Sequence, residues 1–328
     1  MKIFSKNTFK FLTIMILSLL LLNACDKNSS SKENMDKNFT AKQITITYVK
    51  APLNAPSIIE KEKAIFQKYF DKYNIKLSYS QLTTGPEQTQ ALASKDIQFL
   101  YAVGSTSVIL AKANGLDIKI VNKYSKSSKT FTILSQKGTR FKTADDIKGK
   151  KIAGPKGTIL HELLLAYLNS LGLKENDVEF ISMGIPQAQA ALAGKSVDMA
   201  LLAGPSAYSL IQDGYNVVTT ADGLIEPLIV VATTQEFYDE NKILVDEFIN
   251  AQKEILEYID KNYEESMNIV AKETNLDINA VKQMYPLYDF NISINNDDIK
   301  SLEKTKQFML DNKMIDTDIK IEDLFIKD

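Results

Sequence analysis

The sequence predicts an α/β protein of two lobes, connected by two extended segments that form a hinge. Three observations support this fold class. Short runs of β-branched and apolar residues alternate with longer amphipathic runs, which is typical of α/β architecture. The alternation occurs as two similar series along the chain, and an extended segment lies at each end of the second series. Two connections between compact units allow the units to close around a ligand.

The first series follows a polar N-terminal stretch. Residues 44–49 (ITITYV) predict a strand, and residues 56–73 predict a helix with Pro56 near its start, a position that suits proline. The remaining elements of this series are strands at 75–82, 97–103 and 117–124 and helices at 86–94 and 105–115.

The second series repeats this alternation. Residues 143–154 predict a short helix and a strand, and residues 158–172 predict a helix with Gly172 past its end. The elements that follow are strands at 178–183, 197–203 and 215–220 and helices at 186–194 and 205–214. From Phe237 onward the pattern is mostly helical, until Pro286 interrupts it.

The two extended segments on either side of the second series set the predicted lobe boundaries. We expect residues 129–136 and 226–234 to be the hinge crossings. One lobe then consists of residues 44–128 plus 235–328, and the other consists of residues 137–225. Each lobe is expected to be a mixed sheet flanked by helices.

The N-terminus predicts a secretory signal peptide over residues 1–24. Residues 11–22 are almost entirely apolar, and three lysines precede them. Twelve helical residues span about 18 Å, which is too short for a bilayer core of about 30 Å. A basic start, a short apolar run and small residues at its end are typical of a signal peptide. The alternative, a buried helix, is disfavoured because the run has no polar face.

Cys25, the only cysteine of the chain, directly follows this segment. The sequence from Leu22 to Cys25 (LNAC) resembles the bacterial lipobox, in which the cysteine after the cleavage site carries lipid. The resemblance implies that Cys25 anchors the mature chain on the extracytoplasmic side of the cell membrane, since two or more acyl chains bind stably. Residues 25–43 would then be the lipidated cysteine and a flexible tether, because their composition offers almost nothing to bury.

The remaining composition excludes several function classes. The formal net charge is −2, so the chain has no basic surface that would suit nucleic acid. Arg140 is the only arginine and His161 the only histidine. These counts argue against an arginine clamp, a histidine-based metal site and a Cys/His nucleophile pair. We expect no catalytic residue, no metal and no cofactor.

Three segments resemble one family in the same order along the chain. Residues 84–121, 144–173 and 186–208 are similar to corresponding stretches of the aliphatic sulfonate/nitrate/taurine-type substrate-binding proteins of ABC transporters. The resemblance implies a type II periplasmic-binding-protein-like fold, a monomer that captures a small ligand, and a partner permease with its ATPase. The chain departs from the family at Ser107, where proline is frequent, and at 203–205, where an aromatic residue is frequent.

Helix starts at the carboxyl ends of strands are the predicted ligand site. Such starts present unpaired N–H groups and a partial positive charge to an anion, and a cleft is expected at this edge of the sheets. Three predicted starts carry hydroxyl groups, at Ser105 and Thr106, at Thr158, and at Ser206. The alternative is that Ser105, Thr158 and Ser206 are only N-caps of their helices.

Further candidates lie in the neighbouring loops. Asn54 can donate and accept in the loop after the first strand, and Gly85 lies in the turn before the helix at 86–94; both could instead serve only their turns. His161, by its match to a family position, is a candidate donor to an oxyanion, or else a helix-surface histidine. Glu226 could bind an ammonium group or be a plain hinge residue. Lys50 and Lys156 could add positive charge, or be solvated.

The predicted function is a lipid-anchored, extracytoplasmic binding protein that delivers a small anion of the sulfonate, taurine or nitrate type to an ABC importer. One alternative is a binding protein for a thiamine-pyrimidine precursor, which would stack on Tyr48, Tyr101 or Tyr208. A related synthase-like enzyme is disfavoured, because Cys25 is the only cysteine. A sensor lipoprotein with a partner other than a permease is a further alternative.

Overall fold

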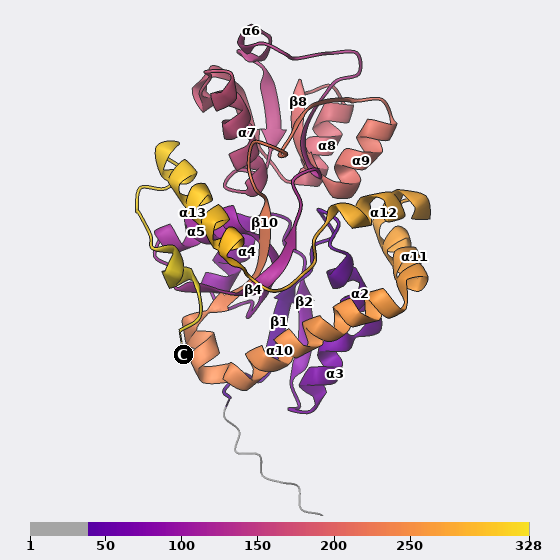
Figure 1. Cartoon of the computed structure of the whole chain (residues 1–328), viewed down its shortest axis with the longest axis vertical. Coiled ribbons are helices and arrows are strands. Elements are labelled where there is room, and N and C mark those ends of the chain that lie inside the picture. Colours follow the sequence, from indigo (N-terminus) through magenta and orange to yellow (C-terminus); the bar gives the residue numbers. More distant parts are fainter. Residues whose placement is uncertain (1–38, 328) are drawn as a thin grey trace, which may run out of the picture. The chain divides into compact units, whose positions relative to one another are not determined.

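The computed structural model describes residues 39–327 (Figure 1). The predicted signal peptide, Cys25 and most of the predicted tether lie outside the described residues. Within residues 39–327, no helix is both long enough and apolar enough to cross a membrane.

The first group of strands combines the start of the chain with a segment from its last third. Strand β1 (Gln43–Thr47) pairs in parallel with β2 (Lys76–Ser80). Strand β10 (Leu228–Thr234) pairs antiparallel with both β3 (Leu100–Gly104) and β4 (Ile118–Lys126). A parallel bridge between Ile46 and Phe99 joins the two sets. The strand order across the group is therefore β2-β1-β3-β10-β4.

The second sheet is built from one continuous part of the chain. Its strands are β5 (Phe131–Ser135), β6 (Lys151–Gly154), β7 (Glu179–Ser182), β8 (Met199–Ala203) and β9 (Asn216–Thr220), in the order β7-β6-β8-β5-β9. The pairs β7-β6 and β6-β8 are parallel, whereas β5 is antiparallel to β8 and β9. The order of directions is the same as in the first group.

Both predicted hinge crossings are extended, and each contributes a strand to a different sheet. Strand β5 lies inside the five-stranded sheet, and β10 lies between β3 and β4. The link before β5 and the link between β9 and β10 connect the two sheets. The mixed α/β class is confirmed, and the predicted lobe boundaries stay a prediction.

Helices flank both sheets (Figure 1). Those of the second series are α6 (Ala144–Ile147), α7 (Ile159–Ser170), α8 (Ile185–Ala193) and α9 (Gly204–Gln212), which Figure 1 shows around β8. The others are α2 (Ala55–Lys63), α3 (Ile65–Asp71), α4 (Gly85–Ala93), α5 (Ser105–Ala113), α10 (Gln235–Lys261), α11 (Tyr263–Thr274), α12 (Ile278–Met284) and α13 (Asn296–Asp311). Short 3₁₀ turns cover Glu175–Asp177, Tyr285–Leu287 and Ile321–Leu324.

The single helix predicted over residues 56–73 is wrong. Ala64 adopts a left-handed conformation with φ of 51°, which ends α2 and starts α3 in a new direction. Neither glycine nor proline marks the break, so packing has overridden local propensity. The helical C-terminal region is confirmed, as is its interruption at Pro286, which lies in a 3₁₀ turn.

An aromatic stack fixes the long helix α10 to the first group of strands. The ring of Phe248 lies 4.2 Å from that of Phe66 on α3 and 4.2 Å from that of Phe99. All three side chains are buried. The stack therefore joins α10 and α3 to the start of β3.

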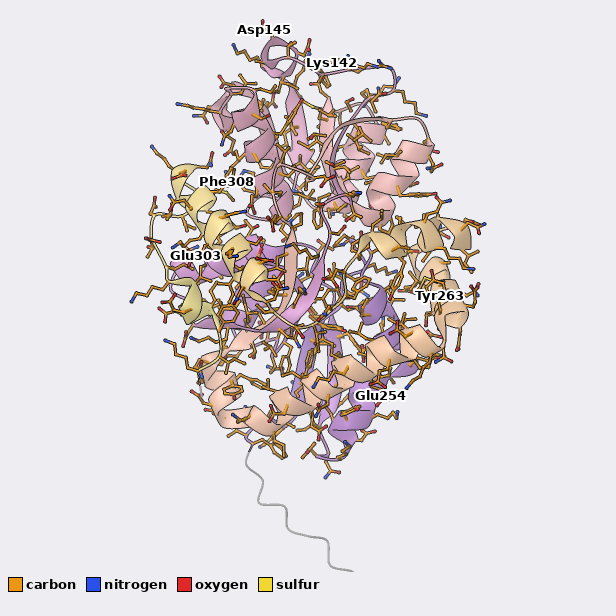
Figure 2. All side chains as sticks on the ribbon, in the orientation of Figure 1. Lys142, Asp145, Glu254, Tyr263, Glu303 and Phe308 are labelled. Carbon is orange, nitrogen blue, oxygen red and sulfur yellow. The ribbon has the colours of Figure 1, made fainter. Side chains whose placement is uncertain are left out.

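Charged side chains such as Lys142 and Asp145 instead extend from the surface near α6 (Figure 2).

Candidate ligand-binding site

A cavity of about 70 Å³ lies where the two sheets meet. Its wall comes from the loop after β1 and from the starts of α4, α5, α7 and α8, represented by Pro52, Gly85, Gly104, Thr158 and Ile185. The starts of several helices therefore converge on one space. This is the arrangement expected at the carboxyl ends of strands in open α/β sheets.

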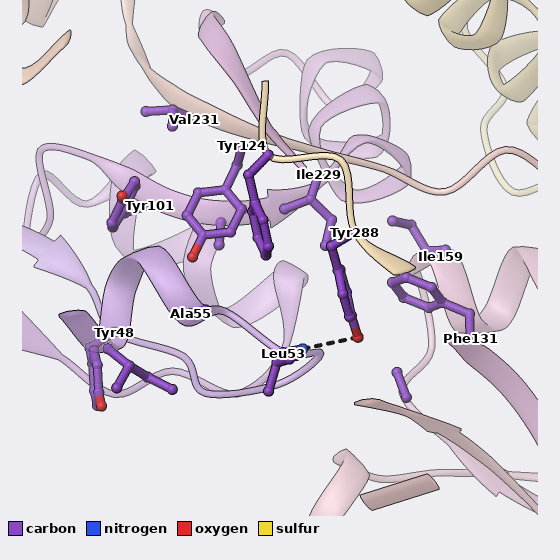
Figure 3. Close-up of a cluster of buried hydrophobic side chains, with 14 of the residues drawn as sticks. Tyr48, Leu53, Ala55, Tyr101, Tyr124, Phe131, Ile159, Ile229, Val231 and Tyr288 are labelled. Atoms are coloured by element: carbon purple, nitrogen blue, oxygen red, sulfur yellow. Dashed lines mark hydrogen bonds between the residues drawn. The ribbon is translucent and has the colours of Figure 1, made fainter. Parts of the chain in front are cut away.

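Part of the cavity wall is apolar. Phe131, Ile159 and Ile229 line the cavity and belong to the buried cluster drawn in Figure 3. In the same cluster the Leu53 N–H donates to the hydroxyl oxygen of Tyr288 at 3.1 Å, which fixes the loop after β1. Apolar walls with few polar groups are usual for small-molecule sites.

No charged side chain of the described chain lines this cavity. Positive potential comes instead from the first turns of the helices, where backbone N–H groups lack partners within their helix. Such a site suits a small anionic group without requiring an arginine clamp. Arg140 is exposed and is not part of the wall.

Gly85 is required by a close approach between α4 and α5. A Cβ atom at this position would lie 2.1 Å from Ser107 Oγ. The same hydroxyl donates to the carbonyl oxygen of Gly157 at 2.8 Å, just before α7. Ser107 thus connects the first series of elements to the second at the cavity wall.

Thr158 lines the cavity but does not cap its helix. It occupies the N-cap position of α7, yet its hydroxyl donates to the Pro155 carbonyl oxygen at 2.8 Å. The N-cap alternative is thus confirmed in position for Thr158, but its side chain makes no capping hydrogen bond. The hydroxyl proton is already used within the loop.

The other predicted hydroxyl groups lie behind the wall. Ser105 and Thr106 are buried in the first turn of α5, and Thr106 donates to Glu162 Oε2 at 2.6 Å. Ser206 is half-buried in the first turn of α9. None of the three lines the cavity. The N-cap alternative is wrong for Ser105 and Ser206, because Gly104 and Ala203 occupy those positions.

Asn54 holds the loop after β1 in place from behind. Its Nδ2 donates to the carbonyl oxygens of Val49 at 2.8 Å and Ala51 at 3.2 Å, and both of these residues line the cavity. Asn54 itself is buried and does not line it. Its structural contribution is to shape the wall.

His161 is buried on α7 and faces neighbours outside the cavity. Its ring stacks on Phe180 at 5.0 Å, and its Nδ1 accepts from the Gly157 N–H at 3.4 Å. Burial lowers the pKa of the imidazole, and this effect outweighs Glu175, whose carboxylate lies 3.5 Å from Nε2 and raises the pKa. The structure does not bring His161 to the cavity wall.

The charged candidates form ion pairs away from this cavity. Glu226 pairs with Lys126 at 2.9 Å and with Lys304 at 3.6 Å. Its hydrogen bond to Lys126, together with the nearby positive charges, lowers the pKa of the Glu226 carboxyl. It lines a separate cavity of about 840 Å³. Lys50 pairs with Glu273 at 3.0 Å, and Lys156 lies 3.5 Å from Glu175.

Among the polar wall residues, Gln88 was absent from the sequence-based candidates, and Ser107 was named only as a departure from the family pattern. Gln88 is buried in α4, four residues before the buried Leu92, so both lie on the inward face of the helix. A polar residue on an otherwise apolar helix face was the available signal. Within residues 39–327, no group of three or more His, Cys, Asp or Glu side chains could hold a metal ion.

Comparisons with known proteins place this site in a family context. The model of the family described as NMT1/THI5 like matches residues 55–266. A Bacillus subtilis (strain 168) protein named as an aliphatic sulfonates-binding protein is 27% identical over 322 residues, which cover 96% of this chain and 94% of that protein. The taurine-binding periplasmic protein of Escherichia coli (strain K12) is 25% identical over 176 residues, or 54% of this chain and 53% of that one.

Solved structures share the fold. The alkanesulfonate-binding protein SsuA from Xanthomonas axonopodis pv. citri, bound to MOPS, matches with a TM-score of 0.78 and 21% identity, over 87% of this chain and 98% of that chain. The periplasmic aliphatic sulphonate binding protein SsuA from Escherichia coli matches with a TM-score of 0.72 and 22% identity, over the same shares. The predicted periplasmic-binding-protein-like class is confirmed.

Proposed function

The chain belongs to the NMT1/THI5-like family, and we propose that it is an extracytoplasmic solute-binding protein that delivers a small ligand to an ABC importer. The ligand carries an anionic group of the sulfonate, taurine or nitrate type. It occupies the cavity between the starts of α4, α5, α7 and α8. The names of the relatives in Bacillus subtilis and Escherichia coli support this assignment.

The observation that carries the proposal is the convergence of helix starts on a cavity without charged side chains. Oriented backbone N–H groups provide the positive potential for the anion. A water needs about 10–15 Å³ of such space, so the cavity of about 70 Å³ has room for about five groups of that size. Methanesulfonate and nitrate are small enough for this space.

Contacts between the second series of elements and the rest of the chain support a hinge mechanism. Ser107 of α5 donates to Gly157, and Glu162 of α7 accepts from Thr106 of α5 and from Thr305 of α13. These bonds join the second series of elements to the rest of the chain. A ligand enters when they open and is enclosed when they form, and the closed form docks on the permease.

We propose that the protein is a monomer and no enzyme. The synthase-like alternative needs a cysteine-rich segment, and Cys25 is the only cysteine. For the pyrimidine alternative, Tyr48, Tyr101 and Tyr208 were the stacking candidates, but none of them lines the cavity.

A thermal-shift screen of the full chain tests the proposal. The panel comprises methanesulfonate, taurine, nitrate, bicarbonate and a thiamine-pyrimidine precursor. A ligand at a hundred times its dissociation constant adds about 2.7 kcal/mol to the free energy of unfolding. We expect stabilisation by a sulfonate or nitrate. Stabilisation by the pyrimidine alone, or by nothing in the panel, would overturn the assigned ligand class.

The lipid anchor is tested separately. Cys25→Ser should release the protein from washed membranes into the soluble fraction, because no acyl chain can then be attached. A Ser29→Ala variant in the same segment is the matched control and should stay bound. Persistence of the Cys25→Ser protein in the membrane fraction would refute the anchor.

A further inference from the structure

The cavity wall contains a buried acceptor without a partner. Gln88 is 3% exposed and lines the cavity. Its Nε2 donates to the carbonyl oxygen of Leu82 at 3.2 Å, which orients the amide because a carbonyl oxygen can only accept. Its Oε1 is buried and has no hydrogen-bond partner among residues 39–327. A buried acceptor is normally paired with a donor, and at a cavity wall a bound ligand can supply one.

Two hydroxyl groups add to the acceptors of the wall. Ser107 donates its proton to Gly157 at 2.8 Å, and Thr158 donates its proton to Pro155 at 2.8 Å. A hydroxyl has one proton and two lone pairs, so both groups can offer only lone pairs to a ligand. Together with Gln88 they make three side-chain oxygens that can accept from a ligand, of which only Gln88 Oε1 is without a hydrogen-bond partner in the described part of the chain. An anion without N–H or O–H groups cannot supply one.

The absence of charged side chains from the described part of the wall also favours a ligand that carries a positive group. Since no charged side chain of residues 39–327 lines the cavity, a bare anion would be balanced only by the helix starts. Burying a charge without a partner is costly. A zwitterion brings its own opposite charge, so that its anionic end can face the helix starts while its ammonium end donates to the oxygens.

Resting on the proposed function, we infer that the cavity selects small zwitterions that carry an N–H donor beside the anionic group, such as aminoalkanesulfonates, and that Gln88 accepts from this donor. Gln88 is then the residue that determines specificity within the ligand class. Ligand analogues that lack the N–H donor should bind more weakly, because they leave Gln88 Oε1 buried without a hydrogen bond.

The test compares two ligands of nearly equal shape. Taurine carries an ammonium group where 1-propanesulfonate carries a methyl group. Both dissociation constants are measured by calorimetry on the full chain in detergent. We expect the parent chain to bind taurine about 10- to 100-fold more tightly, as for a hydrogen bond that involves a charged group. Gln88→Leu should abolish this preference by lowering the affinity for taurine, whereas the affinity for 1-propanesulfonate should stay the same or rise.

Matched variants separate recognition from folding. Thr89→Val changes the neighbouring buried residue, whose hydroxyl bonds Pro86 outside the wall, and should keep the preference. Gln88→Glu keeps an acceptor oxygen at this position and should also keep the preference for taurine over 1-propanesulfonate. If Gln88→Leu does not fold, Gln88→Met replaces it, and the parent chain tests the donor requirement without any variant.

The outcomes distinguish this inference from the proposed function. If the parent binds 1-propanesulfonate as tightly as taurine, the inference is wrong and the proposed function stands. If Gln88→Leu weakens both ligands equally, Gln88 is not the discriminating residue. If the parent binds no sulfonate at all, the assigned ligand class fails, and this inference fails with it.

Discussion

Glu162 should make ligand binding depend on pH. It lies on α7, is 4% exposed, and accepts hydrogen bonds from Thr106 on α5 at 2.6 Å and Thr305 on α13 at 3.1 Å. Burial raises the pKa of its carboxyl from 4.5 to about 7, although both hydrogen bonds act to lower it. Because its partners belong to α5 and α13, outside the second series, separation of α7 from these helices should return the carboxyl to water and restore an ordinary pKa.

The magnitude follows from this difference in pKa. Between pH 4.5 and 7 the closed form binds more protons than the open form, so acid favours closing and a rise in pH opposes it. At 1.36 kcal/mol per pH unit, the difference corresponds to about 3 kcal/mol in favour of the neutral carboxyl. If opening returns the pKa of Glu162 fully to 4.5, binding should be about 70-fold tighter at pH 5 than at pH 8. If opening reverses only half of the pKa shift, the difference should be about tenfold.

The assay is calorimetry with methanesulfonate, whose charge does not change between pH 5 and pH 8. Glu162→Gln should flatten the profile. Glu60→Gln is the control, because burial also raises the pKa of Glu60 to about 7, but its partner Tyr79 lies within the first series. His161 should not contribute to the profile, since its neighbours Phe180, Glu175 and Lys156 all belong to the second series, as His161 does. A flat parent profile, or an unchanged slope in Glu162→Gln, would refute the reasoning.

Three further changes test packing and the cavity wall. Gly85→Ala places a carbon 2.1 Å from Ser107 Oγ and should lower the free energy of unfolding by about 1–3 kcal/mol. Adding Ser107→Gly should restore most of the melting temperature. A further fall in the melting temperature of the double variant would contradict the steric argument. Phe248→Ala removes a ring stacked on two others at 4.2 Å and should cost about 3–5 kcal/mol in urea unfolding, whereas a loss below 1 kcal/mol would speak against the stack as an anchor. Thr158→Ala should weaken taurine about fivefold in a folded protein, because the Thr158 hydroxyl can accept from the ammonium group, and unchanged affinity would argue against a site at this helix start.

The sequence predicted most of the elements but not the hydrogen bonds of the cavity. Alternating runs placed the strand at residues 44–49 close to β1, and Gly172 marked the end of α7 correctly. The break at Ala64 could not be foreseen, because tertiary packing and not local chemistry imposes its left-handed backbone. Residue types showed that glycine and hydroxyl groups gather at helix starts. Whether a hydroxyl donates to a ligand or to its own loop depends on the folded geometry, as Thr158 shows.

Gln88 illustrates the same limit. Its amide is oriented by Leu82, six residues earlier, and its oxygen is left without a partner by the way α4 packs. Sequence spacing can place such a residue on an inward helix face. Only the assembled wall shows that one of its polar atoms stays unsatisfied.

The position of β10 sets an order in which the strands can assemble as the chain is synthesised. All five strands of the second sheet lie within residues 131–220, so this sheet can form as soon as that stretch has emerged. The joining of β3 and β4 waits, because these two strands pair with β10, at 228–234, and not with each other. A chain cut after residue 225 should therefore show slow amide exchange in β8 and fast exchange in β4, and equal protection would contradict this order. In the whole chain, β3 and β4 therefore join one sheet only after residues 228–234 have been added, a third of the chain later than the strands themselves.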